Sequence, residues 1–180
     1  ESYLKYFGQV VARLKLRLGG FISSSYATVD SQKNKKTAGD FFLVDISARN
    51  TDVALSKGGQ VLGVESFNLG GDLLIDKIVQ DFKVSTESAE GYIRGYEAGT
   101  LAPGAIKNLE KSLIGEIEFF RSGITLAINN LNDFAPLPNI IFLSGGGAKF
   151  GLFRKILSQA NWPTDLAIRK KIKVNILTPS

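Results

Sequence analysis

Two segments of the sequence combine residue types that can bind a phosphate group. In residues 45–52, Asp45 lies near the end of an apolar run and is followed by small and hydroxyl side chains. In residues 143–149, Gly145, Gly146 and Gly147 separate an apolar run from a helix-forming segment. Backbone N–H groups of such turns bind phosphate, a helix N-terminus favours anions, and an Asp can hold Mg²⁺ through its water shell. These two segments are therefore the candidates for a magnesium–phosphate site.

Each segment also has a purely structural interpretation. Residues 45–52 are equally typical of a polar hairpin turn with a capping Asp, and three glycines also permit a helix to pack closely on a strand. The glycine segment is not a P-loop, because no Gly-Lys-Ser/Thr follows it. It does not match the Gly-x-Gly-x-x-Gly dinucleotide pattern either, since Phe150 stands at the last position.

The composition of the 180 residues excludes other kinds of chemistry. There is no His, Cys or Met, so triads that use His, the usual zinc sites, iron–sulfur clusters and disulfides are all absent. Because the sequence begins at Glu1 and has no Met, we expect it to be part of a longer protein. No run of about 18 apolar residues predicts a transmembrane segment, and the charged first 20 residues do not form a signal peptide.

The net charge of +5 comes from 22 basic and 17 acidic residues and is mild. The tightest basic cluster, Arg169, Lys170, Lys171 and Lys173, is more typical of a solvated turn before a strand than of a nucleic-acid site. We therefore expect no nucleic-acid partner.

Hydrophobic periodicity predicts an α/β fold of one domain over residues 1–180. Apolar residues spaced by three and four indicate helices, most clearly over 105–131, and the continuous apolar run from Phe41 indicates a buried strand. Gly58 and Gly59 form a hairpin turn, because tight hairpins need positive φ angles. The expected elements are a helix over 1–15, a helix or strand over 21–29, a mobile loop over 30–40, strands over 41–46, 52–56 and 61–69, helices over 70–82, 85–98 and 105–131, a strand over 139–143, a helix over 150–159 and a strand over 173–177.

The order of these elements resembles the second half of the fold of the actin-like ATPase superfamily. Residues 42–54 look like its second phosphate loop, residues 64–72 like its next strand-to-helix step, and residues 145–149 like its adenosine loop. Residues 86–90 and 116–121 are similar to helices of the branch that contains the cell-division protein FtsA and the type IV pilus-assembly protein PilM. The resemblance implies a ribonuclease H-like mixed sheet with an antiparallel three-stranded meander, flanking or inserted helices over 84–132, and a first half that precedes Glu1.

The same resemblance implies ATP and Mg²⁺ as ligands. It assigns the metal to Asp45 and assigns no catalytic residue, so that any ATPase activity is slow and needs both halves of the fold. The residues it assigns to the nucleotide are Ser47, Arg49, Asn50 and Thr51 near the phosphates, Gly70, Gly71, Asp72, Glu90 and Arg94 near the ribose, and Gly145, Gly146, Gly147 and Lys149 near the adenosine.

This sequence departs from the family pattern at the phosphate loop and at the helix over 85–98. Ser47 and Ala48 replace glycines, Arg49 adds a bulky charge that could itself contact phosphate, and Ile93 stands where a Lys is usual. The connection over 99–104 is short, which favours a PilM-like over an FtsA-like protein.

The resemblance implies a cytoplasmic nucleotide-binding scaffold that acts through protein contacts, or through self-association, in a membrane-associated machine of cell division or pilus assembly. Two alternatives stay open: a degenerate domain that binds only proteins, and an enzyme such as a sugar kinase. The helix at the start carries Lys5, Arg13 and Lys15, with Arg17 just beyond, which suits anionic lipid and peripheral attachment to the inner membrane. We nevertheless expect this helix to pack on the domain.

Overall fold

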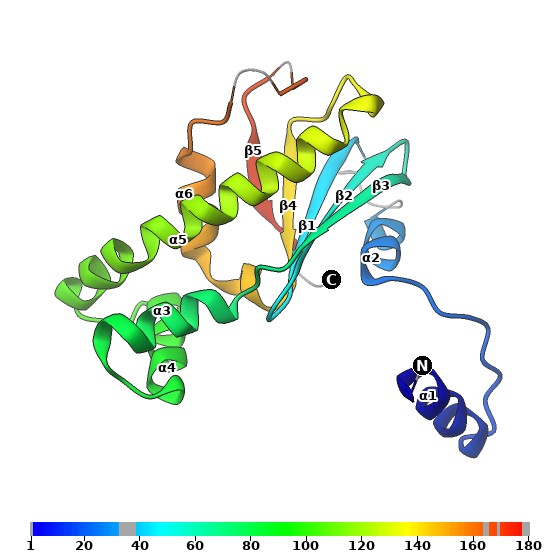
Figure 1. Ribbon diagram of the computed structural model, residues 1–180, viewed down its shortest axis with the longest axis horizontal. Coiled ribbons are helices and arrows are strands. Elements are labelled where there is room, and N and C mark those ends of the chain that lie inside the picture. The colour runs from blue at the N-terminus through cyan, green and yellow to red at the C-terminus, as the bar shows by residue number, and fades with distance from the viewer. Residues whose placement is uncertain (1, 33–38, 164–165, 169, 178–180) are drawn as a thin grey trace.

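The computed structural model describes residues 2–32, 39–163, 166–168 and 170–177, and Figure 1 shows their arrangement. Most elements lie within a few residues of the ranges expected from the sequence, and the segment over 21–29 proves to be helical from Ser24. The elements are α1 (Ser2–Arg13), α2 (Ser24–Gln32), β1 (Phe41–Ile46), β2 (Thr51–Lys57), β3 (Gln60–Phe67), α3 (Asp72–Phe82), α4 (Thr86–Glu97), α5 (Pro103–Asn130), η1 (Asn132–Phe134), β4 (Ile140–Ser144), η2 (Gly147–Lys149), α6 (Gly151–Gln159) and β5 (Lys173–Ile176).

The five strands form one mixed sheet in the order β3-β2-β1-β4-β5. β1, β2 and β3 make the expected antiparallel meander, and Gly58 and Gly59 turn the chain between β2 and β3 with φ values of 57° and 75°. β1 pairs in parallel with β4, so that Asp45 lies beside Ser144, and β4 pairs in parallel with β5. The two candidate phosphate segments therefore leave neighbouring strands at the same edge of the sheet.

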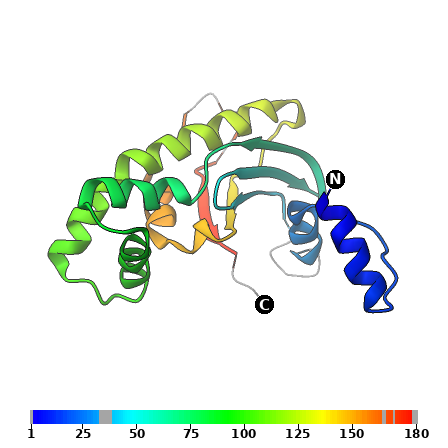
Figure 2. The ribbon, with the colours of Figure 1, turned by 60° about the horizontal axis from the view of Figure 1, so that its bottom comes forward.

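Helices cover the two faces of the sheet unequally. α5 and α6 pack on one face, where they bury the β1 residues Phe42, Val44 and Ile46, and α2 covers part of the opposite face through Val29 (Figure 2). The apolar spacing of α5 explains its position, because the side chains at three- and four-residue intervals all point into the core. α3 and α4 extend from this layer beyond the end of the sheet and contact each other and α5 (Figure 1).

α4 begins where the sequence predicts. The Oγ of Ser85 accepts a hydrogen bond of 3.2 Å from the backbone N of Ser88, so Ser85 is the N-cap. Glu87 lies in the first turn, where a negative charge is favourable next to the helix dipole.

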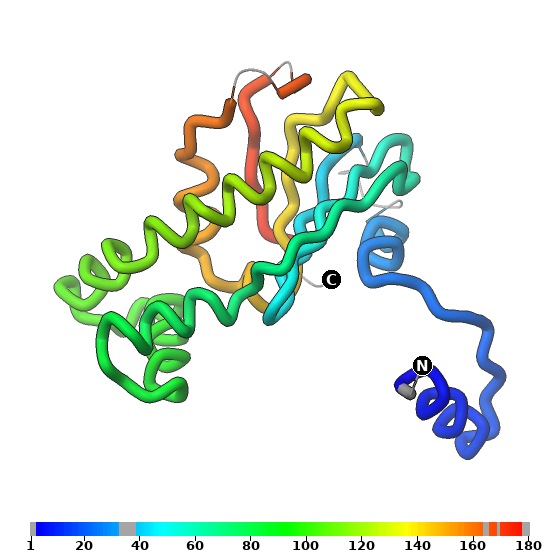
Figure 3. The backbone as a smooth tube through the Cα atoms, viewed as in Figure 1, coloured from blue at the N-terminus to red at the C-terminus, as the bar shows by residue number. Residues whose placement is uncertain are grey.

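The prediction that the first helix packs on the domain is wrong. α1 stands apart from the sheet, and residues 14–23 carry the chain away from it before α2 begins (Figures 1 and 3). Leu4 and Phe7 on its apolar side are 53% and 55% exposed. An amphipathic pattern predicts a helix with one apolar face but does not specify what covers that face.

Two expectations fall partly outside the described residues: positions 33–38 of the loop predicted over 30–40, and Arg169 of the basic cluster. Within the described part of the chain, no helix combines the length and apolar character needed to cross a membrane.

Candidate functional site

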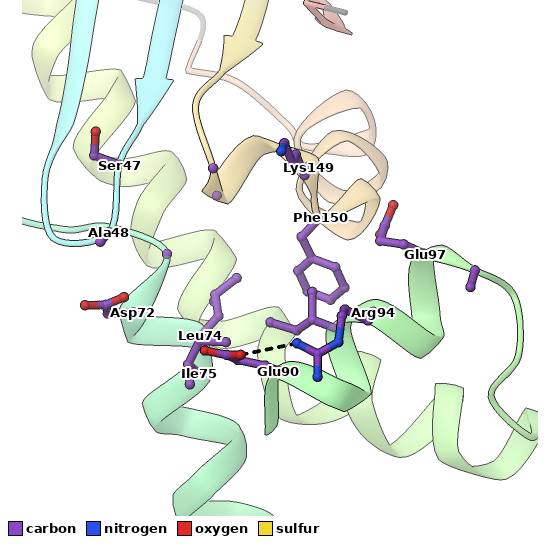
Figure 4. A pocket seen from close by; sticks show the side chains of 15 residues that line it. Ser47, Ala48, Asp72, Leu74, Ile75, Glu90, Arg94, Glu97, Lys149 and Phe150 are labelled. Atoms are coloured by element: carbon purple, nitrogen blue, oxygen red, sulfur yellow. Dashed lines mark hydrogen bonds and ion pairs between the residues drawn. The ribbon is translucent and has the colours of Figure 1, made fainter. Parts of the chain in front are cut away.

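A cavity of about 720 Å³ lies where four segments meet: the turn after β1, the start of α3, one side of α4 and the loop after β4 (Figure 4). Its size is that of pockets that take a drug-sized or cofactor-sized ligand. The lining residues are Ser47, Ala48, Gly71, Asp72, Leu74, Ile75, Glu90, Ile93, Arg94, Glu97, Ala98, Gly146, Gly147, Lys149 and Phe150.

Backbone hydrogen bonds join the turn after β1 to the start of α3. The N–H of Gly71 donates to the carbonyl of Ser47 at 2.8 Å, and the N–H of Asp72 donates to the carbonyl of Ala48 at 2.9 Å. A Cβ on Gly70 would lie 2.2 Å from that same Ala48 oxygen, so only glycine permits the approach. The first amides of α3 are therefore engaged by the turn.

The glycines of the loop after β4 serve different purposes. Gly145 has φ of 87°, and a Cβ there would lie 2.4 Å from the carbonyl oxygen of Ile46; a Cβ on Gly147 would lie 2.5 Å from the Ile46 side chain. Both glycines are thus explained by close packing of this loop on β1. Nothing lies within 4 Å of a Cβ placed on Gly146, which leaves space for a ligand to approach that position.

The cavity has an apolar wall and a charged margin. Leu74 and Ile75 of α3 and Ile93 of α4 contribute apolar surface, and the ring of Phe150 points from the end of the glycine loop toward α4 (Figure 4). Such a wall fits a flat aromatic base. Arg94 and Lys149 supply positive charge at the margin, which favours an anionic ligand.

Each carboxylate that lines the cavity already has a partner. Asp72 pairs with Arg49 at 3.4 Å, Glu90 pairs with Arg94 at 3.2 Å, and Glu97 accepts a 2.7 Å hydrogen bond from the backbone N of Gly151, the first residue of α6. The two ion pairs are exposed, and exposed pairs contribute little to stability and exchange partners readily.

Phe150 packs against Tyr96, which belongs to a polar cluster that links α4, α5 and α6. Its ring contacts Tyr96 edge-on, with centroids 5.2 Å apart. The Tyr96 hydroxyl donates to Glu110 at 2.9 Å, and Lys155 donates to the same carboxylate at 2.7 Å. Burial, followed by the hydrogen bond to Glu110, raises the pKa of Tyr96 to about 12, while the hydrogen bonds from Lys155 and Tyr96 lower the pKa of Glu110.

The structure brings eight of the predicted site residues to the cavity. These are Ser47, Gly71, Asp72, Glu90, Arg94, Gly146, Gly147 and Lys149. Gly70 packs closely against the backbone of Ala48, and Gly145 packs against Ile46, next to the cavity. Arg49 is connected to the cavity only through its ion pair with Asp72.

The remaining three predicted residues, like Gly70, Gly145 and Arg49, do not line the cavity. Thr51 is buried and donates from Oγ1 to the carbonyl of Leu69 at 2.7 Å, and the carbonyl of Asn50 accepts the N–H of Ser47 at 2.9 Å. Asp45 is 9% exposed and accepts a hydrogen bond from Ser24 instead of facing the cavity. Within the described residues, no group of three or more acidic side chains is placed to bind a metal.

Sequence reasoning missed part of the lining. Glu97 lies three residues after Arg94 on the face of α4 that carries Glu90, so helical spacing could have indicated it, and Ala98 follows as the C-cap of α4. Leu74, Ile75 and Phe150 carried no signal, because apolar residues at these positions are also what a core requires.

No protein-family model and no curated protein matches this chain. Solved structures do match. The ethanolamine utilization protein EutJ from Carboxydothermus hydrogenoformans aligns over 93% of this chain and 54% of its own, with 20% identity and a TM-score of 0.63. MreB5 of Spiroplasma citri bound to ADP aligns over 99% and 61%, with 14% identity and a TM-score of 0.58.

The PilM–PilN type IV pilus biogenesis complex aligns over 89% of this chain and 46% of that one, with 20% identity and a TM-score of 0.51. This chain thus spans about half the length of the structures it matches. All three are actin-like ATPases, as the order of elements implied. At these identities the likeness establishes the architecture: this chain has the fold of an actin-like ATPase domain.

Proposed function

We propose that the cavity between the β1–β2 turn, α3, α4 and the glycine loop binds ATP. The observation that carries this proposal is the combination of an apolar wall with a cationic margin in one cavity of nucleotide size. The likeness to MreB5 structures bound to ADP and to AMPPNP supports it. The base would lie against Ile93 and Phe150, and the phosphates toward Ser47 and Gly146.

We extend the same proposal to Mg²⁺, which Asp45 would help to hold beside the phosphates of ATP. One of the Asp45 oxygens accepts a hydrogen bond from the Ser24 hydroxyl, and a Cβ on Gly145 would lie 2.5 Å from the other, so the carboxylate borders the glycine loop without lining the cavity. Bound Mg²⁺ would neutralise phosphate charge; Asp45 would orient it through water, as a single carboxylate does. We expect any hydrolysis to be slow.

The test is calorimetric titration of the chain with ATP and Mg²⁺, compared with a variant whose cavity is filled. Gly146→Leu places a side chain in the open space of the cavity and should abolish binding without disturbing the fold. Gly115→Leu is the matched control, because Gly115 on α5 also has nothing within 4 Å of its Cβ position and lies outside the cavity. Equal heats for the two variants, or no heat from the native chain at high micromolar ATP, would remove the proposal.

A second candidate is a domain that binds proteins but no nucleotide. Ser47 and Ala48 in place of glycines favour it, as do the two ion pairs that already occupy the arginines at the cavity. Replacing Ser47 and Ala48 by Gly should then create ATP binding that the native chain lacks. Native binding would decide against this candidate.

We also propose that the domain acts as a scaffold in a membrane-associated assembly, of the cell-division or pilus type. The exposed apolar side of α1 and the basic residues Lys5 and Arg13 support a contact role for this helix, and the likeness to a PilM–PilN complex supports a protein partner. Flotation with anionic and with zwitterionic vesicles separates lipid from protein contact. Leu4→Glu should abolish whichever contact α1 makes, and retained binding by this variant would exclude α1.

A further inference from the structure

Arg49 is placed at the margin of the cavity by the turn that follows β1. Its side chain is 90% exposed, and its only ion-pair partner among the described residues is Asp72, at 3.4 Å between Nε and Oδ2. Asp72 is the first residue of α3, lines the cavity and is itself about half exposed. The guanidinium can therefore leave this carboxylate without opening any packed structure.

The start of α3 offers few backbone donors to an anion. The amides of Gly71 and Asp72 donate to the turn, and those of Leu73 and Leu74 donate to Gly70 and Gly71. A helix start that would otherwise bind phosphate through its N–H groups is thus already satisfied. A phosphate held against the start of α3 needs a side-chain donor, and Arg49 belongs to the turn next to it.

We propose that Arg49 binds the phosphates of the nucleotide and that Asp72 is its partner only while the cavity is empty. This inference rests on the proposed function. Carboxylate and phosphate present similar paired oxygens to a guanidinium, so Arg49 exchanges one for the other, and the greater charge of a polyphosphate favours the exchange. The pair makes the cavity discriminate by phosphate number: ATP and ADP displace Asp72, and adenosine does not.

The experiment measures the affinities of ATP, ADP and adenosine for the chain and for Arg49→Ala. We expect the variant to bind ATP and ADP at least about tenfold more weakly, and adenosine within about twofold of the native chain, because only a charge-assisted contact is lost. Lys77→Ala is the matched control: it removes the same charge and breaks a similar pair, with Asp81, on α3 outside the cavity. This control should leave all three affinities unchanged.

Asp72→Asn tests the exchange itself. It should tighten ATP binding severalfold in the native background and lose that gain when combined with Arg49→Ala. A gain that persists in the double variant means that Asp72 only repels phosphate, and it overturns the exchange. If Arg49→Ala weakens ATP and adenosine equally, or changes neither, the inference fails while the proposed function stands. If the native chain binds none of the three ligands, both fail.

Discussion

The Oγ of Ser24, at the start of α2, donates a hydrogen bond of 3.0 Å to Oδ2 of Asp45, near the end of β1. The two residues belong to different layers, since α2 covers the face of the sheet opposite α5. Asp45 is 9% exposed, so this hydroxyl is a substantial part of the polar environment of its carboxylate. This hydrogen bond thus joins α2 to the end of β1 next to the cavity, at Asp45, the residue to which metal binding was assigned.

Replacing Ser24 by Ala should lower the free energy of unfolding by about 1–2 kcal/mol, because a nearly buried carboxylate loses a donor. Urea denaturation followed by circular dichroism measures this loss. Ser122→Ala is the control, since among the described residues the Ser122 hydroxyl bonds only to the carbonyl of Glu118 on an exposed helix face, and it should change stability by less than about 0.5 kcal/mol. Equal effects of the two variants would show that the Ser24 contact adds nothing.

Gly70→Ala should destabilise the protein strongly, and Gly146→Ala should not. A Cβ on Gly70 meets the backbone of Ala48 at 2.2 Å, so the turn or α3 must shift, at about 1–3 kcal/mol or more. A Cβ on Gly146 meets nothing within 4 Å, and we expect a change under about 0.5 kcal/mol. Thermal unfolding of both variants checks the contrast. A Gly70→Ala variant that melts with the native protein would contradict the close approach.

Phe120 is the centre of the aromatic core. It is fully buried and contacts Phe67 and Phe153 edge-on, with ring centroids 6.3 and 5.1 Å away. Phe120→Ala should cost about 3–5 kcal/mol of unfolding free energy through lost burial and the cavity left behind. Its neighbour Phe119 is 57% exposed, and Phe119→Ala should cost under about 1 kcal/mol in the same urea titration. If both variants lost a similar unfolding free energy, α5 would have to be rotated about its axis relative to the arrangement described.

Stability at alkaline pH should depend on Tyr96. Its pKa in the folded protein is about 12, against 10.0 for the ordinary phenol, because it is partly buried and donates to Glu110. The folded state therefore holds the proton more tightly, and the stability this gives is complete below about pH 10 and lost as the pH rises to about 12. Urea midpoints should fall more steeply over this range for the native protein than for Tyr96→Phe.

The exposed Tyr26 provides the control for this pH dependence. Tyr26→Phe removes a phenol hydroxyl that is not part of the Glu110 cluster, and this variant should follow the native curve. A Tyr96→Phe curve parallel to the native one would mean that the phenol does not ionise differently in the folded state.

Sequence patterns predicted the elements well where one local rule acts alone. The three- and four-residue spacing that predicts α5 also selects the residues it buries, and the Gly58-Gly59 pair determines both the turn and its positive φ angles. The ends of elements differ by a few residues, because a periodic pattern does not show where backbone hydrogen bonding stops.

The candidate site was predicted less completely, for two physical reasons. A glycine needed for close packing and a glycine needed for ligand approach have the same sequence signal, and only the structure separates Gly145 and Gly147 from Gly146. Contacts such as that between Tyr96 and Phe150 join residues far apart in sequence, so no local pattern encodes them. The prediction for the position of α1 was wrong for a related reason, because its amphipathic pattern does not specify what its apolar face contacts.

The parallel pairing of β1 with β4 has a consequence for biosynthesis. β1 finds its antiparallel partner β2 as soon as the next few residues are made, whereas Ile141, the partner of Phe42, emerges only after α3, α4 and α5. Until then the nascent meander presents the other side of β1, a mostly apolar strand, as an unpaired edge, the kind of surface that recruits foreign strands. Slow translation or early termination before β4 therefore exposes this protein to misassembly, and the cavity, which needs the loop after β4, is among the last features to form.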